Sequence, residues 1–177
     1  KTLFSPIVSS IENVELMTFA YEIEWCSSFL YSDQMSEEAY KEFIKMHVDH
    51  SIYNQMMSRS VNFRLTDLSS AMSHKAKWTY IKRLFQKGDN AILGSIQNGK
   101  PILSLTTCHL MPFIPSLSSA LQERLLFIEI VRDPMFMFHQ LLILQESIIK
   151  KHPEKDFTTR VKVDDIDALG FSDFFSS

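Results

Sequence analysis

The sequence has few cysteines and no long uncharged apolar run. Its two cysteines, Cys26 and Cys108, are too few for a disulfide framework and do not have CxxC spacing. This favours a reducing compartment, and we expect a cytoplasmic protein. The most apolar late region, Met135 to Leu144, is interrupted by His139 and Gln140 and falls short of the roughly 18 apolar residues of a membrane span.

The chain also lacks an excess of positive charge. Its formal net charge is −3, which excludes a broad nucleic-acid-binding surface and makes any anion site a local one. The 14 Phe, 5 Tyr and 2 Trp indicate a folded protein with a sizeable core. We expect one domain over residues 1–177. Because the sequence opens inside what looks like a helix, we expect the N-terminus of this domain to be incomplete.

Apolar periodicity and capping residues predict alternating helices and strands. Ser36 followed by Glu37 and Glu38 predicts a capped helix that continues to about Met57. Two prolines predict a loop over Met111 to Ser118, followed by a short helix over Ser118 to Gln122. The other predicted helices cover residues 3–11, 67–85 and 135–150, and the predicted strands cover residues 14–19, 102–107, 125–131 and 159–163.

Two segments allow more than one interpretation. Ala20 to Leu30 shows no clear period. Asp89 to Pro101 is either a helix over Asn90 to Gln97 closed by Gly99, or a hairpin that turns at Asn98 and Gly99. We favour the helix, because a parallel sheet needs a crossover before its next strand.

The run from Leu125 to Val131 predicts a buried strand of a parallel sheet, and it places Arg132 at the strand's carboxyl end. Ligands of open α/β folds bind at that edge, so Arg132 is a candidate phosphate or sulfate contact. The strand over Ile102 to Thr107 delivers His109 to its own end. If the two strands are parallel, a histidine suited to proton transfer and a fixed cation share one cleft. Taken singly, His109 is more simply a loop cap and Arg132 an ion-pair partner of a nearby carboxylate.

At the N-terminus, Lys1 and Thr2 precede an apolar helix. The free backbone amides and positive dipole of a helix N-terminus suit an anion, and the Thr2 hydroxyl adds a donor.

Three segments together resemble the sulfotransferase family, whose members use 3′-phosphoadenosine 5′-phosphosulfate (PAPS). Lys1-Thr2-Leu3-Phe4 resembles the end of the family's phosphosulfate loop. Thr107-Cys108-His109-Leu110 resembles the Lys-Thr-His-Leu of the catalytic base, and Ile128 to Pro134 resembles the strand and turn whose arginine binds the 3′-phosphate. The resemblance covers about residues 1–145 and implies a three-layer, P-loop-like α/β fold with a central, mainly parallel sheet.

The resemblance also implies roles for particular residues. His109 would be the general base toward a hydroxyl or amine acceptor, on a small molecule or a glycan. Lys1 and Thr2 would hold the phosphosulfate, while Arg132 with Gln140 would anchor the 3′-phosphate, leaving 3′-phosphoadenosine 5′-phosphate (PAP) as the product. This chemistry needs no metal.

Two other functions stay open at this point. Lys1 and Thr2 also resemble the Lys-Thr of a nucleotide kinase loop, with Asp133 as the magnesium ligand. The second is an interaction domain that keeps the fold and has lost catalysis. Two departures from the family suggest it, because the family has lysine at the position of Thr107 and serine at the position of Gln140.

Weaker candidates lie in the middle of the chain. His47 and His50 could begin a metal site, although a solvated helix face accounts for them better. Asn62 and Arg64 could line an acceptor cleft, or form a loop salt bridge.

Overall fold

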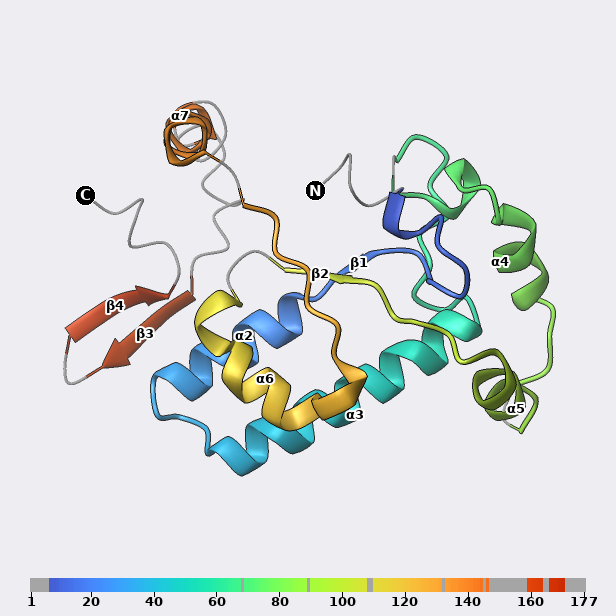
Figure 1. Cartoon of the computed structure of the whole chain (residues 1–177), viewed down its shortest axis with the longest axis horizontal. Helices are drawn as coiled ribbons and strands as arrows, with labels where there is room; N and C mark the ends of the chain where they lie inside the picture. Colours follow the sequence, from blue (N-terminus) through green and yellow to red (C-terminus); the bar gives the residue numbers. More distant parts are fainter. Residues whose placement is uncertain are drawn as a thin grey trace.

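The computed structural model of the chain describes residues 7–67, 69–88, 90–107, 110–131, 133–144, 146, 159–163 and 166–170. Helices dominate this part of the chain, and the strands are short (Figure 1). In chain order the elements are β1 (Thr18–Phe19), α2 (Tyr21–Tyr31), α3 (Glu37–Met56), η1 (Ala71–Ser73), α4 (Lys77–Arg83), α5 (Asn90–Gly99), β2 (Leu105–Thr106), η2 (Met111–Phe113), α6 (Ile114–Leu121), η3 (Gln122–Arg124), α7 (Pro134–Leu144), β3 (Thr159–Val163) and β4 (Ile166–Gly170).

The long helix α3 organises the packing. Its predicted N-terminus is confirmed, because the Ser36 hydroxyl accepts a hydrogen bond from the Ala39 amide at 3.2 Å. Glu37 and Glu38 lie in the first turn, where the helix dipole stabilises negative charge. Helices α2, α5 and α6 all contact α3 (Figure 1), so α3 is the central helix against which the others pack.

The main core lies between α2, α3 and α6. Tyr40 and Ile44 of α3 are fully buried there, against Ile23 of α2 and Leu117 of α6. Cys26 belongs to the same cluster, and burial raises the pKa of its thiol to about 11. A thiol with so high a pKa stays protonated near neutral pH, so Cys26 is a packing residue rather than a nucleophile.

Parallel strand pairing is present, but it joins the predicted strands 14–19 and 102–107, and not 102–107 with 125–131 as the shared cleft required. Thr18 pairs with Leu105 and Phe19 with Thr106, and an isolated parallel bridge joins Val14 to Ile102. Both paired segments lie inside the predicted strands 14–19 and 102–107. The crossover between them contains α5, so the helical interpretation of residues 90–97 is confirmed and the hairpin at Asn98 and Gly99 is wrong.

The predicted strand over Leu125 to Val131 is wrong. The segment is not assigned to a strand, and Leu126 and Val131 are 81% and 80% exposed. Leu125 alone packs against the main core. An apolar run indicates that a segment gains from burial, but it does not supply the neighbouring strand whose backbone would pair with it.

The predicted loop over Met111 to Ser118 is also wrong, because η2 and α6 occupy this segment. Pro112 and Pro115 each stand in the first turn of their helix, where the missing amide hydrogen is not needed. Between residues 67 and 85 the single predicted helix is replaced by η1 and α4.

The described strands form two separate sheets, the parallel pair β1–β2 and the antiparallel hairpin β3–β4. The predicted strand Thr159–Val163 is confirmed as β3, and β4 was missed. The chain is thus mixed α/β with one parallel pair. Of the predicted N-terminal helix, Ile7 and Val8 are helical and residues 1–6 lie outside the described part. Within the described ranges, no helix is long and apolar enough to cross a membrane.

Candidate functional site

The carboxyl ends of β1 and β2 lie at the same edge of the parallel pair. The Ala20 amide donates to the Thr106 carbonyl at 3.1 Å, which extends the pairing one residue past β1. Helix α2 begins at the next residue, Tyr21, so the N-terminus of this helix lies at the same edge. Thr107 leaves β2 at the same edge.

Most residues of the predicted site fall outside the described part of the chain. Lys1, Thr2, His109 and Arg132 belong to this group, so the structure neither brings them together nor separates them. Gln140 is described, and it is exposed on α7.

The neighbours of His109 are well anchored. Thr106 lies in β2, and Leu110 is buried in the main core. The described residues on either side of His109 are therefore held by the sheet and by the main core. The neighbours of Arg132 differ, because Val131 is exposed and the Asp133 carboxylate accepts a hydrogen bond from the Met135 amide at the start of α7.

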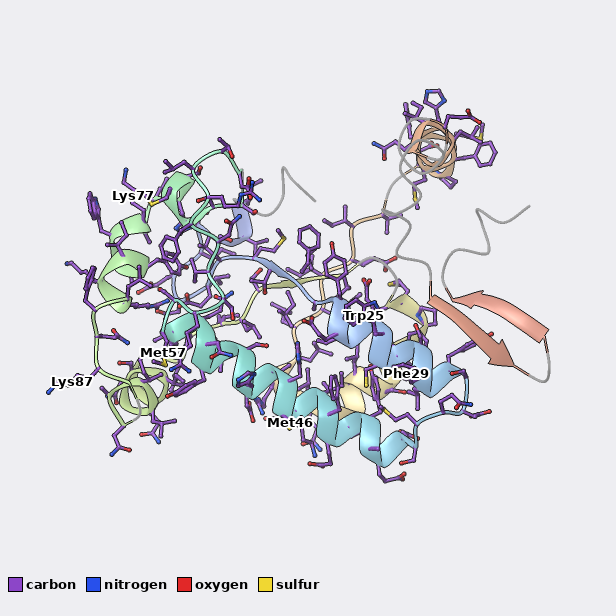
Figure 2. All side chains as sticks on the ribbon, turned by 180° about the vertical axis from the view of Figure 1, so that it is seen from behind. Trp25, Phe29, Met46, Met57, Lys77 and Lys87 are labelled. Atoms are coloured by element: carbon purple, nitrogen blue, oxygen red, sulfur yellow. The ribbon has the colours of Figure 1, made fainter. Side chains whose placement is uncertain are left out.

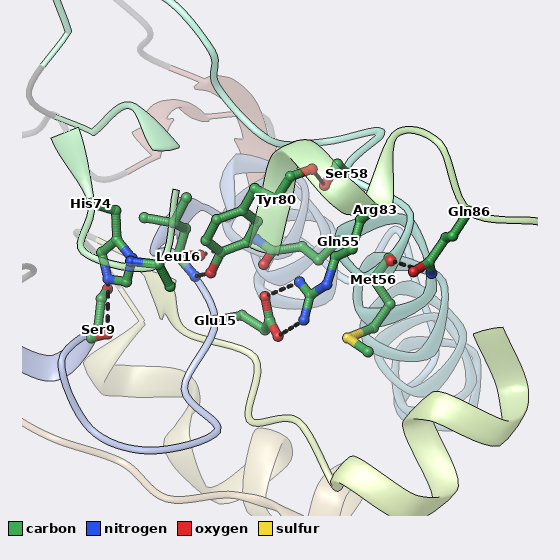
Figure 3. Close-up of polar contacts among 11 residues, drawn as sticks. Ser9, Glu15, Leu16, Gln55, Met56, Ser58, His74, Tyr80, Arg83 and Gln86 are labelled. Carbon is green, nitrogen blue, oxygen red and sulfur yellow. Dashed lines mark hydrogen bonds and ion pairs between the residues drawn. The ribbon is translucent and has the colours of Figure 1, made fainter. Parts of the chain in front are cut away.

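A buried ion pair holds the chain that leads into β1 (Figure 3). The Arg83 guanidinium of α4 donates to both carboxylate oxygens of Glu15, at 2.6 and 2.8 Å. The two side chains are only 13% and 6% exposed. Two parallel hydrogen bonds between ionised groups form the strongest class of side-chain contact, so this pair fixes the position of β1 relative to α4.

Further buried hydrogen bonds surround the ion pair (Figure 3). The Tyr80 hydroxyl accepts from the Leu16 amide at 3.0 Å, and the Ser58 hydroxyl donates to the Tyr80 carbonyl at 2.8 Å. On the other side of Leu16, the Gln55 amide donates to the Leu16 carbonyl at 3.0 Å. Side chains from α3 and α4 thus satisfy the backbone of Leu16, in the segment that leads into β1.

Tyr80 gives this cluster a predicted alkaline pH dependence. Burial, with a smaller effect of the Glu15 charge, raises the pKa of Tyr80 to about 12. In the unfolded chain a tyrosine ionises near pH 10, so the unfolded state loses its proton first and the free energy of unfolding falls between about pH 10 and pH 12. The slope from one such group is at most about 1.4 kcal/mol per pH unit.

Urea unfolding across this pH range checks the prediction. Tyr80→Phe should be less stable by about 1 to 3 kcal/mol at pH 7, because the buried Leu16 amide loses its acceptor. It should also show a shallower decline above pH 10. Tyr40 and Cys26, whose pKa values burial also raises, should keep the remaining slope. Equal slopes for the two proteins would contradict the assignment.

A neutral pocket lies beside β1. It has a volume of about 210 Å³ and is lined by residues 16–19, Gln55, the loop 60–62 and Ser69, none of which carries a charge. Gln55 is only 1% exposed, and its carbonyl oxygen has no hydrogen-bond partner. The orientation of its amide is fixed, since only the NH2 group can donate to the Leu16 carbonyl.

The loop on the far wall of the pocket is preorganised. The Asn62 side chain donates to Asp67 at 3.0 Å and to the Ser69 hydroxyl at 3.2 Å, and it accepts from the Arg64 amide at 2.9 Å. Asn62 thus lines a pocket, and its predicted place in an acceptor cleft stays a prediction. Arg64 instead forms the loop salt bridge with Asp67, at 3.9 Å.

A row of three exposed aromatic side chains starts at the pocket. Phe19, which lines the pocket, stacks on Tyr21 with ring centroids 5.5 Å apart, and Tyr21 stacks on Trp25 at 6.3 Å. Their exposures are 46%, 41% and 46%. Figure 2 shows Trp25 and Phe29 along α2. The sequence analysis missed this row, although the spacing of Tyr21, Trp25 and Phe29 by four residues was a visible signal.

The histidines of α3 do not complete a metal site in the described part of the chain, where no group of three candidate ligands occurs. His47 stacks on Phe43, and burial lowers the pKa of its imidazole. The amide of Asn54 lies 3.0 Å from His50 Nε2. Both histidines thus have ordinary helix-surface contacts.

Comparison with known proteins gives no match. No protein-family model, no curated protein and no solved structure is significantly similar to this chain.

Proposed function

We propose that this chain is a sulfotransferase-like enzyme that transfers a sulfuryl group from PAPS to a hydroxyl or amine acceptor. The observation that carries the proposal is the parallel pairing of β1 with β2. Thr107 leaves β2 at the edge where α2 begins, and His109 follows it two residues later in the sequence. Ligands of open α/β folds bind at this edge, in keeping with the sequence likeness of Thr107 to Leu110. The proposal includes the three-layer, P-loop-like architecture that the likeness implies.

In the proposed reaction His109 accepts the proton of the acceptor hydroxyl or amine. The freed lone pair forms a new bond to the sulfur of PAPS, the bond from sulfur to the bridging phosphate oxygen breaks, and PAP leaves. Lys1, Thr2 and the backbone amides at the first helix would stabilise the sulfuryl oxygens, and Arg132 with Gln140 would hold the 3′-phosphate.

Calorimetric titration with PAP tests the donor site. We expect the protein to bind PAP, and Arg132→Ala to weaken binding by roughly 1.5 to 3 kcal/mol, the scale of a charge-assisted hydrogen bond. Arg64→Ala is the matched control, because Arg64 is exposed in a different loop. A protein that has no affinity for PAP, or that binds magnesium and ATP in its place, would refute the proposal.

One observation favours a second function, a domain of this fold without catalysis. The segment before Arg132 is exposed and unpaired instead of forming a strand. PAP binding without transfer to any acceptor would favour this alternative.

A further inference from the structure

We propose that the neutral pocket and the aromatic row Phe19–Tyr21–Trp25 together bind a neutral saccharide. The proposal names the acceptor class for the proposed sulfuryl transfer and rests on that function for its catalytic meaning. Saccharide binding itself can be measured without any transfer.

The pocket has the chemistry that a sugar hydroxyl requires. A hydroxyl both donates and accepts, and the residues that line the pocket include Thr18, Ser60 and Ser69, whose own hydroxyl groups do the same. The Ser69 oxygen accepts from Asn62, which leaves its own proton to be donated elsewhere.

The size of the pocket sets the part of the ligand that enters. At about 210 Å³ it is smaller than the roughly 300 to 1,000 Å³ typical of sites for drug-sized ligands. One sugar unit therefore occupies the pocket, and further units of a longer saccharide lie outside it.

The aromatic row supplies the other half of sugar recognition. The face of an aromatic ring carries partial negative charge, and the C–H groups on one side of a sugar ring are slightly positive. Phe19 can offer its ring face to a sugar whose hydroxyl groups enter the pocket, because it lines the pocket and is almost half exposed. Its stacking on Tyr21 fixes the ring, so little side-chain entropy is lost on binding.

The lack of charge in the pocket lining selects neutral saccharides. No residue that lines the pocket is ionised. The anion of a uronic-acid or sulfated sugar would lose hydration there without meeting a compensating cation.

The experiment uses the full chain and four trisaccharides: cellotriose, chitotriose, maltotriose and the anionic trigalacturonate. Saturation-transfer NMR detects binding, and calorimetry gives affinities. We expect at least one neutral trisaccharide to bind, and to bind more tightly than trigalacturonate. Phe19→Leu keeps the apolar bulk but removes the ring face, so it should lower affinity about ten-fold. Ser69→Ala, on an exposed loop, should lower affinity about five-fold.

Phe85→Leu is the control, since Phe85 is 84% exposed and does not line the pocket. Circular dichroism verifies that every variant folds. The proposal is overturned if no neutral trisaccharide binds, if trigalacturonate binds more tightly than all of them, or if Phe85→Leu and Phe19→Leu lose equal affinity. PAP titration of the same samples separates the two proposals: PAP binding without sugar binding refutes the saccharide site alone, and sugar binding without PAP binding refutes the proposed transferase alone.

Discussion

Replacing Arg83 with methionine is expected to lower the free energy of unfolding by about 3 to 5 kcal/mol, because it leaves Glu15 as a buried charge without its partner. Methionine keeps the apolar stem of the side chain, so the loss reports the missing guanidinium and not a cavity. Glu15 is 6% exposed, and the other nearby donor, the Tyr80 hydroxyl, accepts from the Leu16 amide and keeps its own proton to donate, but it is neutral and cannot replace the cation. Urea unfolding followed by circular dichroism gives the measurement.

Two comparisons make this result specific. The double variant Glu15→Leu with Arg83→Met should recover much of the loss, because it removes both charges at once. Arg124→Met breaks the ion pair with Asp49, in which both side chains are more than half exposed, and should cost no more than about 1 kcal/mol. Equal losses for Arg83→Met and Arg124→Met would show that burial adds nothing to the first pair.

The ion pair matters for the site as well as for stability. β1 ends at Phe19, and the segment that leads into it is held by hydrogen bonds of the Leu16 backbone with the Tyr80 and Gln55 side chains and by the Glu15–Arg83 pair. Loss of the pair should therefore loosen the edge at which the proposed site lies.

Local signals in the sequence predicted the elements that local interactions decide. The start of α3 depends on one side chain, Ser36, and on the residues that follow it, so the capping pattern was sufficient. The prolines of η2 and α6 misled because the same residue suits a loop and the first turn of a helix, and only the surrounding packing separates the two.

The strands show where local information ends. Segment 102–107 is less apolar than the run Leu125 to Val131. It nevertheless pairs with β1, whereas the more apolar run lies exposed. Apolar character was a poor guide because strand pairing is decided by distant backbone, here between Thr18 and Leu105.

The candidate site was predictable only in part. Asn62 was placed at a cleft from its loop, but the pocket also requires Gln55 and β1, which meet only through the fold. The same holds for Glu15 and Arg83, which lie 68 residues apart in the chain. Nothing in either local sequence distinguishes this pair from solvated charges.

His109→Ala should lower the rate of sulfuryl transfer by about 10²- to 10⁴-fold, the range that a positioned general base contributes. The assay supplies PAPS and, as acceptors, a simple phenol and the neutral trisaccharides, and it measures the PAP released in each case. PAP affinity should stay unchanged, because the proposed histidine contacts the acceptor and not the 3′-phosphate. The wild-type rate should fall as the pH drops below about 6.5, where an ordinary histidine becomes protonated.

His50→Ala is the matched control, since His50 is exposed on α3 and its recorded contact is with Asn54. It should retain both transfer and its pH dependence. If His109→Ala retains the wild-type rate, the base must be another residue. If both the wild-type protein and His109→Ala bind PAP but neither releases PAP from PAPS with any acceptor, the protein has a donor site and no transferase activity. This outcome would favour the domain without catalysis. Thr106 in β2 and Leu110 in the main core are unchanged in His109→Ala, and circular dichroism verifies that the variant folds, so a lower rate reports on chemistry.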